Sequence, residues 1–231
     1  IGKPMRASAT WLCAAAAVAL GLATSASCSS SNPRDDVARQ AIAYGAPDTA
    51  HSAVVALLAS TTDGFGACSG TIVQVLGDFG YVLTAAHCCN EATPSVVVMG
   101  EDYADGLAYL GGIPQPPAYS VASGTVYYDP LYTGTDHDFC MLKFSGATGA
   151  PTIALPSGSD GLTVGTSAEH VGYGVTDIST DNTTRRTGTS QVEALDALEI
   201  QWAQGGVSDT PGTCFGDSGG PALTPAGAAQ G

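Results

Sequence analysis

Short apolar or alternating runs recur along most of this chain, and Gly, Pro, Asp or Asn falls in nearly every gap between them. Runs of this kind are typical of β-strands, and many of them at short spacing favour an all-β sandwich or barrel. The stretch 145–151, rich in Gly, Thr and Pro, is the best candidate for a boundary between two lobes, and a long loop is the alternative. We predict strands at 53–59, 71–76, 81–84, 95–99, 125–128, 139–144, 152–155, 169–171, 191–195 and 198–202.

The N-terminal part differs, since its apolar residues are continuous and form no helical face. Lys3 and Arg6 precede the apolar run 11–23, and small residues follow that run. This order is typical of a secretory signal, and the run is too short to span a bilayer as a helix. We therefore expect a signal peptide at 1–28 and, in the polar stretch 29–41, a linker or short pro-segment.

Cys28 lies among serines just after the apolar run, and it also fits the acylated first residue of a bacterial lipoprotein. Ser25 stands where such a signal has an apolar residue, so a cleaved leader and a lipid anchor at Cys28 both stay open. The chain begins with Ile1, and Met5 fits as the true start. Either leader predicts a secreted protein or one held at the outer cell surface.

Composition narrows the class of protein further. With 44% hydrophobic and 12% charged residues, the chain is too apolar to be disordered and long enough to bury one or two modest cores. Lys and Arg total 7 against 21 Asp and Glu, a formal net charge of −14. Such a charge repels phosphate backbones and anionic lipid, so we expect no nucleic-acid partner and no membrane contact except through a lipid anchor.

Three motifs contain candidate chemistry: His87 within TAAHC, Asp138 at the start of DFCML, and Ser218 within GDSGGP. A serine hydroxyl is a poor nucleophile at neutral pH, so an imidazole must take its proton and return it to the leaving group. A carboxylate then holds the imidazole in one tautomer and stabilises its cation. The glycines beside Ser218 let the N–H groups of Gly216 and Ser218 point together at a developing oxyanion.

With these motifs the chain resembles the trypsin and chymotrypsin family of serine peptidases, from about Ile42 to its last residue. The resemblance also rests on CSGTI at 68–72, DPLY at 129–132 and VGYG at 171–174. It implies an all-β fold of two six-stranded antiparallel Greek-key barrels with the site in the cleft between them. We place the first barrel at about 42–148 and the second, incomplete in this chain, at 149–231.

By the same resemblance, His87 is the general base and acid, Asp138 its orienter and Ser218 the nucleophile that forms an acyl-enzyme. Asp136 competes with Asp138, because both lie beside His137, but only Asp138 directly precedes an apolar run as the family's aspartate does. The remaining histidines, His51, His137 and His170, lack metal-ligand spacing and fit packing or surface roles. We expect neither a metal nor a cofactor.

The segment IAYG at 42–45 resembles the N-terminus that this family creates on activation. The freed amino group of Ile42 would pair with Asp217, the carboxylate before the nucleophile, and such pairing would lock the oxyanion turn. Two departures weaken the match: Tyr44 replaces a usual Gly, and Ala41, not a basic residue, precedes the cut. The alternative is that Ile42 merely starts a strand.

Seven cysteines are present, five of them after the leader. An oxidising compartment favours disulfides, and the family resemblance pairs Cys68 with Cys88. Cys89 and Cys140 either pair with each other or leave Cys140 as a buried free thiol. Cys214 matches a family cysteine whose partner lies farther on, and the chain ends 13 residues after Ser218. We therefore expect a C-terminally truncated sequence that is poorly stable and nearly inactive alone.

The family position at the base of the specificity pocket falls on Gly212, which has no charge to pair with Lys or Arg. We predict a monomeric serine endopeptidase, acting on protein or peptide substrates and cutting after small or medium apolar residues. A catalytically silent binding module or cell-surface lipoprotein is the first alternative. An esterase is the second, although those enzymes place Ser first in chain order.

Overall fold

The computed structural model describes residues 42, 45–90, 92–134, 136–158, 161–176, 182–196, 199–203, 212–213, 215–224 and 229–230. The predicted leader 1–28 with Cys28, the linker 29–41 and Cys214 lie outside the described residues. Of the helices in the described part, none is long and apolar enough to cross a membrane.

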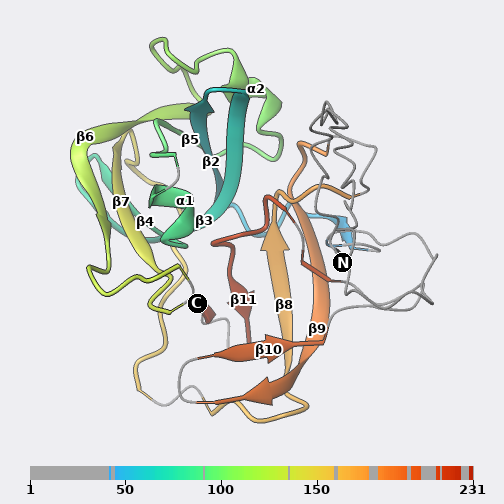
Figure 1. Cartoon of the computed structure of the whole chain (residues 1–231). Helices are drawn as coiled ribbons and strands as arrows, with labels where there is room; N and C mark the ends of the chain where they lie inside the picture. Colours follow the sequence, from blue (N-terminus) through green and yellow to red (C-terminus); the bar gives the residue numbers. More distant parts are fainter. Residues whose placement is uncertain are drawn as a thin grey trace, which may run out of the picture.

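The first lobe is a closed antiparallel barrel of six strands in the order β2-β3-β4-β7-β6-β5. Figure 1 shows it as the blue-green to yellow half of the molecule, wrapped around its own interior. Its strands are β2 (Val54–Thr61), β3 (Gly64–Leu76), β4 (Phe79–Thr84), β5 (Val96–Val98), β6 (Ala118–Tyr128) and β7 (Cys140–Ser145).

Strand β2 shows how one strand contributes to two cores. Side chains alternate across a strand, so Val55 and Leu57 point to one face and Val54, Ala56 and Leu58 to the other. The first face joins the barrel interior with Phe144 and Ile72. The second face packs in a separate cluster that includes Val171, Tyr173 and Leu223 of the second lobe. Because both faces are covered, β2 is apolar without interruption from Val54 to Ala59.

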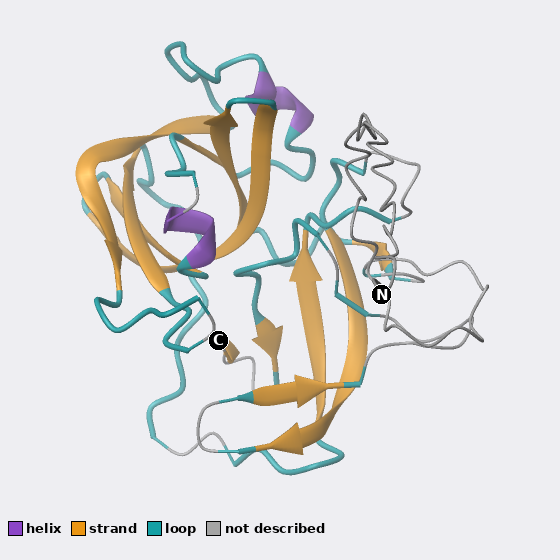
Figure 2. Cartoon of the chain, in the orientation of Figure 1, coloured by secondary structure: helices purple, strands orange, loops and turns teal. Residues whose placement is uncertain are grey.

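The second lobe is an open sheet in the order β1-β9-β8-β11-β12, with β10 paired to the other part of β9. Figure 2 shows its longest strands standing beside the barrel, with few helices anywhere in the described chain. The short β1 pairs with β9, so the start of the described chain lies against the second lobe. The strands are β1 (Ala46–Pro47), β8 (Ser167–Gly172), β9 (Arg186–Leu195), β10 (Ile200–Trp202), β11 (Ala222–Leu223) and β12 (Ala229–Gln230).

The all-β prediction is confirmed, and every predicted strand except 152–155 overlaps an observed one. The prediction of a strand at 152–155 is wrong. Pro151 and Pro156 flank this stretch and lack the N–H that a sheet ladder needs, so only Ile153 bonds to a strand, donating to the Ile72 carbonyl at 3.0 Å. The helices α1 (His87–Asn90) and α2 (Ala104–Leu107) were not predicted and are each about one turn long.

A buried ion pair joins the segment after β1 to the second lobe. The Arg185 Nε lies 2.6 Å from Asp48 Oδ2, and both side chains are almost fully buried. The Arg185 Nη1 also donates to the Val54 carbonyl at 3.1 Å and to the Tyr173 hydroxyl at 3.2 Å. Burial opposes ionisation of Asp48, but the hydrogen bonds from Arg185 and His51 outweigh it and lower the pKa of Asp48.

Tyr173 extends this network into the first lobe. Its hydroxyl donates to the Gly100 carbonyl at 2.6 Å, at the end of the β5 region. Burial raises the pKa of Tyr173 to about 12, so the hydroxyl keeps its proton at every physiological pH. The two lobes are therefore joined by apolar packing and by a satisfied polar network around Arg185.

Candidate active site

The pairing of two barrel strands brings His87 and Asp138 together. Strands β4 and β7 are antiparallel, and Thr84 at the end of β4 lies opposite Cys140 at the start of β7. His87 follows Thr84 by three residues and begins α1, while Asp138 precedes Cys140 by two. Residues far apart in sequence thus meet at one rim of the barrel because of this register.

Asp138 binds His87 through both of its carboxylate oxygens. The His87 backbone N–H donates to Oδ1 at 2.9 Å, and the ring Nδ1 lies 2.7 Å from Oδ2. A carboxylate accepts hydrogen bonds, so the proton belongs on Nδ1 and the lone pair on Nε2. Both side chains are about one-third exposed, which leaves Nε2 accessible as a base.

Asp136, the competing candidate, makes no hydrogen bond or ion pair with His87 in the described structure. Its neighbour His137 adopts a left-handed backbone conformation, with φ of 57°, and its Nδ1 lies 3.1 Å from Asp129 Oδ2. Such a conformation is uncommon for a residue with a side chain. It turns the chain so that Asp138, not Asp136, faces the imidazole.

Ser218 stands in a tight turn between the lobes. Its carbonyl accepts a hydrogen bond at 2.9 Å from the N–H of Ser69, on β3 of the first barrel. The next residue must be glycine, because a Cβ at Gly219 would lie 2.6 Å from the Ser69 carbonyl oxygen and 2.7 Å from the Ala85 nitrogen. The GDSGGP motif therefore allows this close approach of the turn to the first barrel.

Gly216 has a φ of 96°, a conformation that favours glycine. In the described part of the chain, neither the Gly216 N–H nor the Ser218 N–H donates to another protein group. Unpaired amides in such a turn are suited to bind an anionic oxygen. The Asp217 side chain between them is buried, and its Oδ1 accepts from the Gly174 N–H at 2.7 Å.

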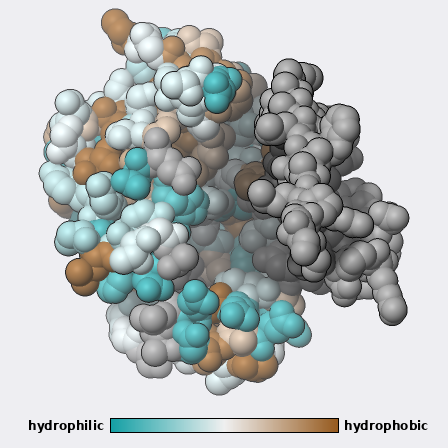
Figure 3. All heavy atoms as spheres, viewed as in Figure 1, coloured by the Kyte–Doolittle hydropathy of each residue, from teal (hydrophilic) through white to brown (hydrophobic). Residues whose placement is uncertain are grey.

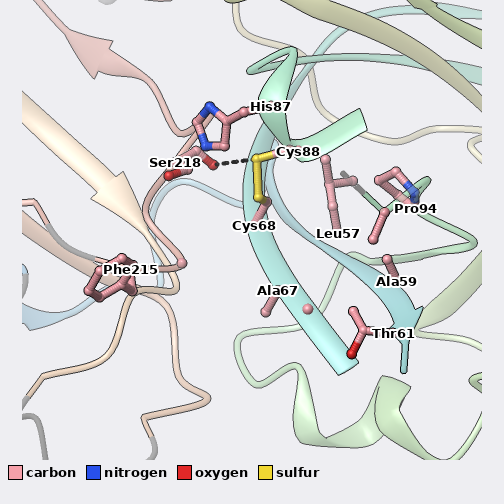
Figure 4. A pocket seen from close by; sticks show the side chains of 13 residues that line it. Leu57, Ala59, Thr61, Ala67, Cys68, His87, Cys88, Pro94, Phe215 and Ser218 are labelled. Atoms are coloured by element: carbon pink, nitrogen blue, oxygen red, sulfur yellow. Dashed lines mark hydrogen bonds between the residues drawn. A yellow bond between two sulfur atoms is a disulfide. The ribbon is translucent and has the colours of Figure 1, made fainter. Parts of the chain in front are cut away.

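His87 and Ser218 line one cavity of about 570 Å³, together with Gly216. Figure 4 shows the His87 ring beside Ser218 at one end, with the cavity continuing past the disulfide toward β2. Its other walls are mostly apolar: Leu57, Ala59, Thr61, Gly66, Ala67, Cys68, Cys88, Ala92, Pro94 and Phe215. On the face shown in Figure 3, apolar residues are interspersed with polar ones.

Two disulfides hold the surroundings of His87. The predicted bond between Cys68 and Cys88 is present, and Cys89 pairs with Cys140, which settles the question left open by the sequence. The second bond ties α1 directly to the start of β7. Cys68, His87 and Cys88 are close enough to group around a metal, but both sulfurs are bonded to each other and are not thiolates.

The remaining predicted site residues have no contact with the cavity. Ile42 is buried, and its carbonyl accepts from the Gly45 N–H at 2.7 Å. In this uncleaved chain the Ile42 nitrogen is an amide, not an ammonium, and none of the contacts described for Ile42 reaches Asp217. Gly212 is partly buried and does not line the cavity.

Other residues at the site were not predicted from the sequence. Ser69 contacts the turn around Ser218, and Phe215, 57% exposed, forms one wall of the cavity. No local motif marks either residue as functional, because each reaches the site only when the two lobes pack together. In the sequence, Ser69 is distinguished only by its place in the CSGTI segment.

The fold and the site define a class: two-lobed all-β proteins in which a histidine and aspartate of one lobe face a serine turn of the other. The family model described as Trypsin matches residues 42–231, and the chain belongs to this family of serine endopeptidases. With the two disulfides, membership indicates an extracellular protein.

Solved structures show the same fold at low identity. A protein named GrC is 21% identical, with 80% of this chain and 84% of that chain covered and a TM-score of 0.63. HL collagenase is 20% identical, with 80% and 81% covered and a TM-score of 0.57. Human heparin binding protein is 16% identical, with 82% of each chain covered and a TM-score of 0.60. The search of curated proteins found no match.

Proposed function

We propose that this protein is an exported serine endopeptidase that cleaves proteins through an acyl-enzyme. The observation that supports this most is the bidentate contact of His87 with Asp138 at the rim of a cavity that Ser218 also lines. The backbone N–H of His87 fixes one carboxylate oxygen, so the other is aimed at the ring. This arrangement supplies an oriented base next to a nucleophile.

In the first step the Ser218 hydroxyl attacks the carbonyl carbon of the substrate, and its proton moves to Nε2 of His87. The carbonyl oxygen becomes an anion and accepts hydrogen bonds from the N–H groups of Gly216 and Ser218. When the C–N bond breaks, His87 gives the proton to the departing amine. Water then attacks the ester by the same route, with His87 taking its proton and returning it to Ser218.

Two subsites follow from the positions of the cavity and of Gly212. Gly212 provides no charge, so we assign small or medium apolar residues to the position before the cut. The cavity beside the Cys68–Cys88 disulfide is separate from Gly212, and we assign it to the residue after the cut. Its walls include Leu57, Pro94 and Phe215, so it favours an apolar side chain there as well.

Activation is part of the proposal. Removal of the chain before Ile42 would free its amino group, which would then pair with buried Asp217 and order the turn between Gly216 and Ser218. The segment that is removed contains the leader and Cys28, the site of lipidation if the leader is of the lipoprotein type. Activating cleavage would release the catalytic domain from such an anchor.

A catalytically silent binding module is the alternative function. Human heparin binding protein has this fold and is named for binding, so the fold alone does not decide between the two functions. The intact contact between His87 and Asp138 favours catalysis, because a binding module has no need for a base held in one tautomer.

A panel of fluorogenic peptides and matched esters tests the proposal. Once the chain has been cut before Ile42, the protein should cleave internal peptide bonds after apolar residues, and Ser218→Ala should abolish cleavage while the fold, followed by circular dichroism, stays unchanged. Cleavage of esters alone would favour an esterase. Unchanged cleavage by Ser218→Ala would rule out the proposed function.

A further inference from the structure

Ser69 is a polar residue in the buried part of strand β3. Its side chain is fully buried, yet it makes two hydrogen bonds. The hydroxyl donates to the Gly216 carbonyl at 2.7 Å and accepts from the Tyr173 N–H at 2.9 Å. Both partners belong to the second lobe, so one hydroxyl of the first barrel joins two segments of the other lobe.

The backbone of Ser69 adds a third link to the same turn. Its N–H donates to the Ser218 carbonyl at 2.9 Å, and its own carbonyl accepts from the Thr84 hydroxyl at 2.7 Å. Ser69 therefore holds the Gly216–Ser218 turn at both ends, while Thr84, three residues before His87, holds Ser69. These contacts link the turn of the nucleophile to the end of β4, three residues before the base.

The space around the hydroxyl leaves it little freedom. A Cβ added at Gly172 would lie 2.9 Å from the Ser69 Oγ, and one added at Gly220 would lie 3.2 Å from the Ser69 Cβ. The serine is thus enclosed by glycines of the two second-lobe motifs. It fits there because those positions carry no side chains.

The link to the Gly216 carbonyl has a consequence for the oxyanion site. Gly216 adopts a φ of 96°, and glycine has few steric limits to keep it there. Fixing its carbonyl orients the peptide unit between Gly216 and Asp217, which lies between the two candidate donors, the N–H groups of Gly216 and Ser218. A preorganised donor pair stabilises the transition state more than the bound substrate.

We propose that Ser69 is a positioning residue that holds the oxyanion turn in its working conformation from the opposite lobe. The proposal rests on the proposed function. It implies that the turn is supported by the first barrel as well as by the pairing of Ile42 with Asp217.

The test compares Ser69→Ala with a matched control, Ser190→Ala. Ser190 is also a buried serine, bonded to His170 in the second lobe, and its loss removes the same atom from a place away from the site. Active sites are counted by fluorophosphonate labelling, so that kcat refers to folded, competent protein only. Ser69→Gly serves as a second variant. Like Ser69→Ala, it removes the hydroxyl and keeps the backbone hydrogen bonds.

We expect Ser69→Ala to lower kcat per active site by about 10- to 100-fold, less than the loss of a whole oxyanion donor, with KM within about twofold. The affinity for a peptidyl trifluoromethyl ketone, whose adduct carries an oxyanion, should fall by the same factor. Ser190→Ala should change neither value. Ser69→Gly should show the same pattern as Ser69→Ala.

Ser69→Ala and Ser69→Gly variants with kcat and ketone affinity within twofold of the wild type would overturn the proposal, as would equal losses in Ser190→Ala. These results presuppose that the wild type is labelled at Ser218. A wild type that has been cut before Ile42 and is neither labelled nor active would instead overturn the proposed function, and the role of Ser69 with it.

Discussion

The two lobes contribute to the candidate site in different ways. In the first lobe, His87 and Asp138 lie at the ends of two paired strands of a closed barrel, and the disulfide between Cys89 and Cys140 joins the same two places. The contact between His87 and Asp138 is therefore formed within the first lobe. It needs nothing from the second lobe.

The second lobe provides Ser218 on a turn whose position depends on the first. The turn is bonded to Ser69 across the interface, and the sheet behind it is open and not closed into a barrel in the described residues. The nucleophile is therefore aligned by contacts between the lobes, whereas the base is aligned by contacts within the first lobe. Changes in the first lobe should alter the chemistry, and changes at the interface should alter stability and alignment together.

The largest expected effect comes from breaking the pair inside the first lobe. Asp138→Asn keeps the shape but cannot hold the same His87 tautomer, so we expect kcat to fall by about 10⁴-fold with little change in KM. Steady-state kinetics on a peptide substrate measure this. Asp136→Asn is the matched control and should stay within about twofold of the wild type. A larger loss in Asp136→Asn than in Asp138→Asn would contradict the assignment.

The next effect concerns the buried network around Arg185, which reaches from the second lobe to the Val54 carbonyl of the first. Arg185→Met leaves Asp48 as a buried charge without its partner, which should lower the free energy of unfolding by about 3–5 kcal/mol. Urea denaturation measures the loss. The double variant Arg185→Met with Asp48→Leu removes both charges and should recover much of the stability. A single variant as stable as the wild type would show that this ion pair does not contribute to stability.

A smaller effect is expected when the disulfide between Cys89 and Cys140 in the first lobe is removed. Replacing both Cys89 and Cys140 with Ala opens a loop of about 50 residues, so the free energy of unfolding should fall by about 2–4 kcal/mol. Thermal unfolding checks this, and kcat at a temperature where the protein is folded reports on the contact between His87 and Asp138. Unchanged stability would contradict the expected contribution of the disulfide, and an unchanged kcat would mean that the barrel alone fixes that contact.

The last effect lies in the second lobe and appears only in acidic solution. Burial lowers the pKa of His170 from 6.5 to about 4, so between these pH values the unfolded chain binds a proton that the folded chain does not. Stability should therefore fall as the pH drops from 6.5 to 4, by about 3 kcal/mol in all. His170→Gln should flatten this part of the curve, as followed by urea denaturation. An identical slope in the variant would show that other groups cause it.

Much of the fold and of the candidate site could be predicted because the information is local. Strand patterns are set by residues next to each other, and the motifs around His87 and Ser218 contain the turn glycines and flanking residues that their geometry needs. The strand predicted at 152–155 failed because its apolar pattern was right but the prolines on either side removed the ladder donors.

The rest could not be predicted because it depends on which segments meet in space. The pairing of Cys89 with Cys140 follows from the register of β4 against β7, which the sequence does not state. The contacts of Ser69 need the two lobes to be packed together, and the cavity is formed by segments from several places in the chain. Each of these features is a property of the interface or of the barrel, not of a motif.

The most direct test of the account is the rate of fluorophosphonate labelling, followed by mass spectrometry of the labelled peptide. A reagent of this kind reacts with a serine only when a base activates it and donors stabilise the adduct. For protein cut before Ile42, we expect one label per chain, at Ser218, and at least a 10³-fold slower reaction in His87→Ala. Labelling spread over several serines, or an equal rate in His87→Ala, would contradict it.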